Sequence, residues 1–207
     1  MIFDYPQEPP KRRHGPAGYT GYKPYKPWLR DDFTFRCVYC LTRERWSPWG
    51  QTSFSVEHMV PQSEDKEQIT EYANLLYACT LCNSTRKDRA LLDPCQVALG
   101  KHLRVQEDGA LEGLSPDGVA LVKVLGLNGP TLTDFRRRII ALMRQYENNP
   151  KLEATPDTLD LLQRWMGFPK DLPDLVALRP PDGNSKPAAA RDCHYERRKR
   201  GELPESY

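Results

Sequence analysis

The sequence predicts an α+β protein: a small core of short strands, loops and one helix, held by a four-cysteine zinc site and followed by a mainly helical extension. Two observations lead to this fold class. Two Cys-x-x-Cys pairs flank strand-like runs between positions 37 and 82. Beyond residue 93 the apolar residues recur at helical spacing instead.

Composition limits the classes of protein to which the chain can belong. Of its 207 residues, 39% are hydrophobic and 28% are charged, and the formal net charge is +2. The chain contains no run of about 18 apolar residues, and residues 1–28 lack the apolar stretch of a signal peptide. We therefore expect a cytoplasmic protein without membrane contact, in which an acidic ligand must find a local basic patch.

The two ends of the chain have distinct compositions. Residues 1–30 set aromatic and Lys side chains among several prolines, which disfavour a helix, so we expect an extended arm. Such an arm either stacks on nucleic-acid bases or packs over the domain. Residues 181–207 are polar with a basic run, which predicts either a phosphate-binding arm or a solvated terminus.

Residues 31–92 form the predicted core. The run 52–58 is a strand candidate, and residues 75–79 are a second, shorter one. A helix is expected to begin near Asn83 and to continue through the basic residues that follow. The core therefore combines short strands with one helix.

Residues 93–180 form the predicted helical extension. Pro116 stands where the first turn of a helix accepts proline, and Gly126 ends that helix. The strongest helix is expected over residues 131–146, where apolar residues share one stripe. The other predicted elements are a turn over 94–100, a hairpin around 107–109 and a helix over 157–166.

Four cysteines stand at the spacing of a zinc site. Cys37 and Cys40 form one Cys-x-x-Cys pair, and Cys79 and Cys82 form the other. Four thiolates at this spacing suit a tetrahedral Zn²⁺ with no open position for substrate, so we assign the ion a structural role. A redox dithiol or two disulfides are the alternatives. The remaining two cysteines are expected to be free thiols: Cys95 and Cys193.

Other polar residues fall between and after these pairs in a recognisable order. The order resembles the motif of the HNH endonuclease family: Cys-x-x-Cys, Asp-His-h-x-Pro, Asn-Leu and Cys-x-x-Cys-Asn-x-x-x-Lys. The resemblance covers residues 36–90 and implies a ββα-metal fold, in which two antiparallel strands and a helix surround one divalent ion. Besides the cysteines, the matching residues are Glu57, His58, Pro61, Asn74, Leu75, Asn83 and Lys87.

The resemblance implies a role for each polar residue of the motif. His58 is expected as the general base, Asn83 as a metal ligand and Asn74 as a brace for the loop between the strands. An imidazole suits the first role because it titrates near neutrality. The expected ion is Mg²⁺ or Mn²⁺, which needs few protein oxygens because it keeps much of its hydration. Glu57 stands where the family usually has Asp, so its carboxylate either binds the metal or orients His58.

Basic residues near the motif predict phosphate contacts. Arg86, Lys87 and Arg89 follow Asn83 and are expected to contact the DNA backbone, which gives affinity and salt dependence without sequence readout. For Arg86 and Arg89 a solvated helix face is the alternative. The run 136–138 consists of arginines and is either a second phosphate track or solvated charge.

The sequence therefore predicts an enzyme, a metal-dependent endonuclease that nicks or cuts double-stranded DNA. Beyond the core, Leu92-Asp93-Pro94 and Leu125-Gly126-Leu127-Asn128 resemble the C-terminal extension of small bacterial HNH proteins of anti-phage defence. That resemblance implies an ATPase or another effector-complex partner. The alternatives are a zinc-braced nucleic-acid-binding module that does not cut, and a docking subunit of a larger complex.

Overall fold

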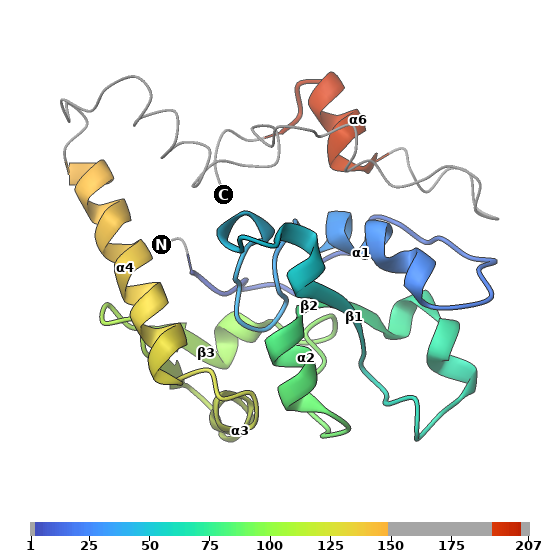
Figure 1. Ribbon diagram of the computed structural model, residues 1–207, viewed down its shortest axis with the longest axis horizontal. Helices are drawn as coiled ribbons and strands as arrows, with labels where there is room; N and C mark the ends of the chain where they lie inside the picture. Colours follow the sequence, from blue (N-terminus) through green and yellow to red (C-terminus); the bar gives the residue numbers. More distant parts are fainter. Residues whose placement is uncertain (1–2, 149–191, 204–207) are drawn as a thin grey trace. The chain divides into compact units, whose positions relative to one another are not determined.

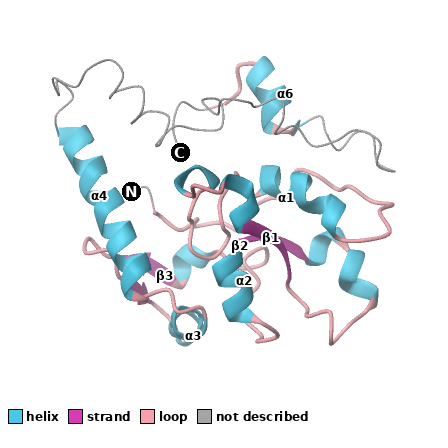
Figure 2. Cartoon of the chain, in the orientation of Figure 1, coloured by secondary structure: helices cyan, strands magenta, loops and turns pink. Residues whose placement is uncertain are grey.

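The computed structural model describes residues 3–148 and 192–203, which form two compact units. The first unit comprises residues 11–88 and 192–203, and the second comprises residues 3–10 and 89–148. Figure 1 colours the chain along its sequence. Figure 2 shows that helices and strands are mixed along the described chain.

The first unit is built on two strands and a helix. β1 (Phe54–His58) pairs antiparallel with β2 (Leu75–Cys79), and α2 (Thr80–Arg86) follows β2 without a loop. The buried rings of Phe54 and Tyr77 stack with their centroids 5.1 Å apart, and they join the two strands on one face. The expected α+β class and its ββα core are confirmed.

Helix α2 begins at Thr80, earlier than the expected start near Asn83. The sulfur of Cys79 caps the helix by accepting a hydrogen bond from the backbone N–H of Cys82 over 3.4 Å. The helix ends at Arg86, and the next residue, Lys87, has a φ of +52°, which lies in the left-handed region. Asn83 is therefore the central residue of this short helix.

Part of the expected N-terminal arm is helical. The 3₁₀ turn Lys23–Tyr25 leads into α1 (Lys26–Asp32), and a proline occupies one of the first two positions in each. The extended arm was the wrong prediction here, because proline costs nothing in a first helical turn, whose N–H groups lack partners. Trp28 and Leu29 are fully buried, and α1 packs against β2.

The C-terminal tail also contains a helix. In α6 (His194–Lys199), the His194 side chain is fully buried and its backbone N–H donates to Asp31 over 2.9 Å. A wholly solvated terminus is therefore the wrong description of residues 192–199. The predicted tail before residue 192 lies outside the described residues.

The second unit joins a hairpin to two helices. β3 (Leu103–Val105) pairs with β4 (Leu111–Gly113), and α3 (Pro116–Val124) and α4 (Pro130–Asn148) follow. These elements match the predicted ones, whereas the helix expected over 157–166 lies outside the described residues. Among the helices of residues 3–148 and 192–203, none is long and apolar enough to cross a membrane.

The arginine run of α4 is divided between interior and surface. Arg136 is only 2% exposed, and its guanidinium donates to the carbonyl oxygens of Gly109 and Leu127, each over 2.6 Å. Arg137 and Arg138 are exposed. A phosphate track that includes Arg136 is therefore wrong, because its side chain fastens α4 to the hairpin turn.

Candidate active site

Four cysteines gather where β2 meets α2. Their Sγ atoms all lie within 4.8 Å of one another. All four are free thiols, so the two alternative disulfides are absent. The cluster consists of Cys37, Cys40, Cys79 and Cys82.

The sulfur geometry fits a tetrahedral zinc ion. Zn–S bonds of about 2.3 Å place two sulfurs about 3.8 Å apart at tetrahedral angles, and the Sγ atoms of Cys40 and Cys79 are 3.7 Å apart. Hydrogen bonds with the other cysteines, Cys37 first, lower the pKa of Cys40, whereas burial raises the pKa of Cys37. The four sulfurs thus share protons in a buried place, where a dication would stabilise the thiolate forms.

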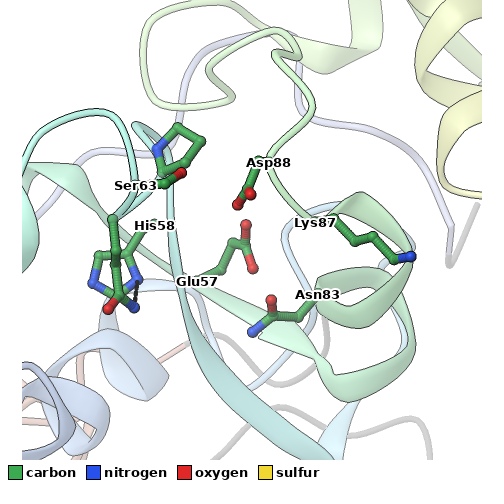
Figure 3. Close-up of a pocket in the computed structure, with 8 residues that line it drawn as sticks. Glu57, His58, Ser63, Asn83, Lys87 and Asp88 are labelled. Carbon is green, nitrogen blue, oxygen red and sulfur yellow. Dashed lines mark hydrogen bonds between the residues drawn. The ribbon is translucent and has the colours of Figure 1, made fainter.

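A pocket of about 340 Å³ opens where the end of β1 faces α2 (Figure 3). Glu57 and His58 reach it from the last two residues of β1, and Asn83 reaches it from α2. The other lining residues are Pro61, Gln62, Ser63, Lys87 and Asp88. The pocket therefore brings three of the predicted site residues together.

Hydrogen bonds fix the tautomer of His58. Its Nε2 lies 3.1 Å from the backbone oxygen of Ile69, which only accepts, so Nε2 carries the proton. Its Nδ1 then holds a lone pair, to which the amide of Gln62 donates over 3.2 Å. Burial lowers the pKa of His58, so the imidazole is neutral and basic at neutral pH.

Asn83 is held by its nitrogen. Its Nδ2 donates to the backbone oxygen of Val56 over 3.2 Å and to the hydroxyl of Ser55 over 2.7 Å. Because the Val56 oxygen can only accept, this contact fixes which amide atom is nitrogen. Figure 3 shows the Asn83 oxygen turned toward the Glu57 side chain. Among the described residues that oxygen has no hydrogen-bond partner, which leaves it available to a cation.

Glu57 forms an ion pair inside the protein. One oxygen of its carboxylate, Oε1, accepts from the guanidinium of Arg86, and both side chains are at most 4% exposed. Burial raises the pKa of Glu57, and the hydrogen bond from Arg86 opposes this shift. The second oxygen, Oε2, has no partner among the described residues. Glu57 and Asn83 thus each offer one oxygen, the donor type that Mg²⁺ and Mn²⁺ prefer.

Asn74 lies outside the pocket lining. Its side chain accepts from the backbone N–H of Val60 over 2.7 Å and donates to the oxygens of Val60 and Gln68. These three bonds hold the loop that connects β1 to β2. Asn74 therefore acts on the loop, and its side chain forms no hydrogen bond with Glu57, His58 or Asn83.

The three basic residues expected to bind DNA have different surroundings in the structure. Arg86 is completely buried, so the surface phosphate contact predicted for it is wrong. Lys87 lines the pocket, and its ammonium points away from the Glu57 carboxylate in Figure 3. Arg89 belongs to the second unit, where it donates to the backbone oxygen of Val124 over 3.3 Å.

Sequence reasoning gave no role to three residues that line the pocket, Gln62, Ser63 and Asp88, and it also missed the burial of Arg86. Gln62 follows His58 by four residues within a loop, and nothing in that spacing signals a bond to the imidazole. Asp88 follows the motif lysine directly, and its carboxylate faces that of Glu57 in Figure 3. The only sequence signal for a role of Asp88 was that a carboxylate directly follows the motif lysine.

Comparison with known families gives one match. Residues 37–89 match a family model described as HNH endonuclease. The matched range begins at the first cysteine of the cluster and includes every residue that lines the pocket. No curated protein sequence matches the chain.

Proposed function

We propose, proceeding from the HNH endonuclease domain at residues 37–89, that this protein hydrolyses phosphodiester bonds of DNA with one divalent metal ion. The observation that carries the proposal is the pocket, which is lined by the neutral His58 and by Glu57 and Asn83, each of which has one unpartnered oxygen. Glu57 and Asn83 are the proposed metal ligands, and Mg²⁺ or Mn²⁺ is the proposed ion. Double-stranded DNA is the proposed substrate.

His58 is the proposed general base. Its Nδ1 takes a proton from water, the water oxygen bonds to phosphorus, and the bond to the 3′ oxygen breaks. The departing oxygen takes a proton from solvent, which leaves 5′-phosphate and 3′-hydroxyl ends. The amide of Gln62 donates to Nδ1 and thereby marks the direction from which a water would donate. Glu57 and Asn83 would hold the divalent ion, which would supply positive charge where negative charge builds up during the reaction.

Lys87 and Arg89 are the remaining candidates for contacts with the DNA backbone. Lys87 is exposed at the pocket rim, and Arg89 is exposed in the second unit. Phosphate contacts of this kind predict binding that weakens steeply with salt and does not depend on sequence.

A plasmid assay tests the proposal. The wild-type protein is incubated with supercoiled DNA and Mg²⁺ or Mn²⁺, beside His58→Ala and the matched pocket variant Ser63→Ala. We expect nicking by the wild type and by Ser63→Ala, and a loss of about 100-fold or more in His58→Ala, the contribution of a general base. Each variant must retain zinc and a wild-type melting temperature.

The same assay separates enzyme from binding module. DNA that is shifted in a gel but left uncut by both wild type and His58→Ala contradicts the endonuclease and favours the binding module.

We also propose, from the sequence resemblance of the C-terminal half alone, an anti-phage role beside an ATPase or other effector-complex partner. Nicking that appears only after such a partner is added is the result expected for that role.

A further inference from the structure

Arg86 is buried, although arginine side chains are mostly exposed in folded proteins. It is 0% exposed, and its guanidinium donates to the Glu57 carboxylate and to the backbone oxygens of His58 and Met59. All three acceptors belong to the end of β1 and the residue after it. Arg86 therefore binds the C-terminal end of β1 to the last turn of α2.

The contact with Glu57 is one-sided. The guanidinium engages Oε1, while Oε2 has no partner among the described residues. A carboxylate held at neither oxygen could rotate about its last side-chain bond, whereas the guanidinium fixes Oε1. Arg86 thus fixes the plane of the Glu57 carboxylate.

Arg86 and Asn83 stand three residues apart on α2, so they lie on the same side of the helix. The same helix therefore fixes the position of the Asn83 carboxamide oxygen and of the Arg86 guanidinium, which holds the Glu57 carboxylate. Because the two oxygens that face the pocket depend on α2, their separation is set before any cation arrives.

We propose that Arg86 is a positioning residue for the metal site, which turns the free oxygen of Glu57 toward a divalent cation shared with Asn83. The proposal rests on the proposed function, because that function identifies the pocket as the metal site. Arginine suits the task because its planar fork reaches the carboxylate and two backbone oxygens at once. A lysine carries its three donors on one nitrogen, which cannot occupy the positions of both Nη1 and Nη2.

The same unit offers a matched control. Arg30 and Glu44 also form a buried pair, with Nε and Nη2 of Arg30 donating over 2.8 and 2.7 Å to the two oxygens of Glu44. Neither residue lines the pocket. Arg30→Lys therefore perturbs a comparable buried ion pair without touching the proposed metal ligands.

The experiment measures Mn²⁺ affinity by electron paramagnetic resonance in zinc-loaded, DNA-free protein. We expect Arg86→Lys to weaken Mn²⁺ binding by about 10- to 100-fold, as loss of an outer-shell partner does. Arg30→Lys should keep wild-type affinity even where its melting temperature falls. Equal Mn²⁺ affinity in Arg86→Lys and wild type overturns the positioning role.

A second variant guards against misfolding of Arg86→Lys. Glu57→Asp keeps the charge but draws the carboxylate one methylene away from Arg86, so we expect weaker Mn²⁺ binding by a similar factor. Wild-type or tighter binding in Glu57→Asp overturns the proposal, because an unheld carboxylate would then suffice. Absence of Mn²⁺ binding in the wild type overturns the proposed metal site as well, whereas equal binding in all variants overturns only the role of Arg86.

Discussion

At the residue scale, the pocket contains a second carboxylate with no place in the motif. Asp88 faces Glu57, and its charge adds to the effect of burial in raising the pKa of Glu57. Two like charges that face one another are stabilised by a cation between them. Arg86 offsets the charge of Glu57, so the charge of Asp88 would help to draw a cation to the pocket.

We predict that Asp88→Asn raises the Mg²⁺ concentration needed for half-maximal nicking by about fivefold. An exposed carboxylate contributes on the order of 1 kcal/mol toward a nearby unit charge in water, which corresponds to about a fivefold change in affinity. The melting temperature should not change, because Asp88 is exposed. A Mg²⁺ titration of the nicking rate measures the effect.

Glu64→Gln is the control for this titration. Glu64 is also an exposed carboxylate of the first unit, but it does not line the pocket. An equal Mg²⁺ requirement in Asp88→Asn and Glu64→Gln would contradict a role for Asp88 at the metal.

Among the helices and strands, the elements of the core that could be predicted are those encoded by residues close together in the sequence. β2 occupies the predicted residues, because Leu75 to Cys79 form an apolar run that suits a buried strand. The spacing of the two Cys-x-x-Cys pairs alone also predicted the cysteine cluster. The start of α2 was missed because Cys79 serves as its cap, and cysteine is not among the usual capping residues.

The interactions that sequence could not reveal connect residues far apart in the chain. Arg86 was assigned to DNA because arginine near a helix end is usually solvated, whereas its partner Glu57 stands 29 residues earlier. Arg136 was likewise placed on a surface face, although the carbonyl of Gly109 accepts from it. Burial of a charge depends on such distant partners, which periodicity does not encode.

We predict that removing zinc unfolds the ββα core. The free energy of binding a structural zinc ion, about 10–16 kcal/mol in small zinc domains, is comparable to or larger than the total stability of a typical domain, about 5–15 kcal/mol. Cys79 and Cys82 also set the start of α2, so Asn83 loses its position when the ion leaves. Chelation at neutral pH, followed by circular dichroism, measures the loss of structure.

Cys82→Ser and Cys95→Ser provide the comparison for this experiment. Cys82 belongs to the cluster, whereas Cys95 lies in the second unit and forms no disulfide. We expect only Cys82→Ser to lose zinc and nicking. A chelated wild type that melts at an unchanged temperature would show that the cluster does not hold the fold together.

At the scale of the whole first unit, a buried carboxylate joins three distant segments. Asp31 of α1 accepts from Nε2 of His14 over 2.9 Å and from the backbone N–H of His194 over 2.9 Å. Nδ1 of His194 also lies 3.1 Å from the Asp31 carboxylate. Burial alone raises the pKa of Asp31, but the hydrogen bonds from both histidines outweigh it and hold that pKa below its usual range. The docking of α6 therefore depends on groups that titrate.

His194 sets the direction of the pH dependence. Burial lowers its pKa below the ordinary value of 6.5, and the positive charges of Arg13 and Arg197 act in the same direction, while Asp31 opposes them. The unfolded chain therefore binds more protons below about pH 6.5, so stability is lost as the pH falls through the folded pKa. Asp31 contributes a further loss at lower pH, because its folded pKa is also depressed.

We predict that the free energy of unfolding of the zinc-loaded protein falls between pH 7 and pH 5, by at most about 1.4 kcal/mol per pH unit for the proton on His194. His194→Gln removes this titration and should reduce the slope over that interval, while His58, whose pKa burial also lowers, continues to contribute to it. His102→Gln, which changes a histidine of the second unit, should keep the wild-type slope. Denaturant unfolding at a series of pH values, with zinc in excess in every sample, measures the three slopes. A slope in His194→Gln that equals that of the wild type would show that burial of His194 does not couple α6 to pH.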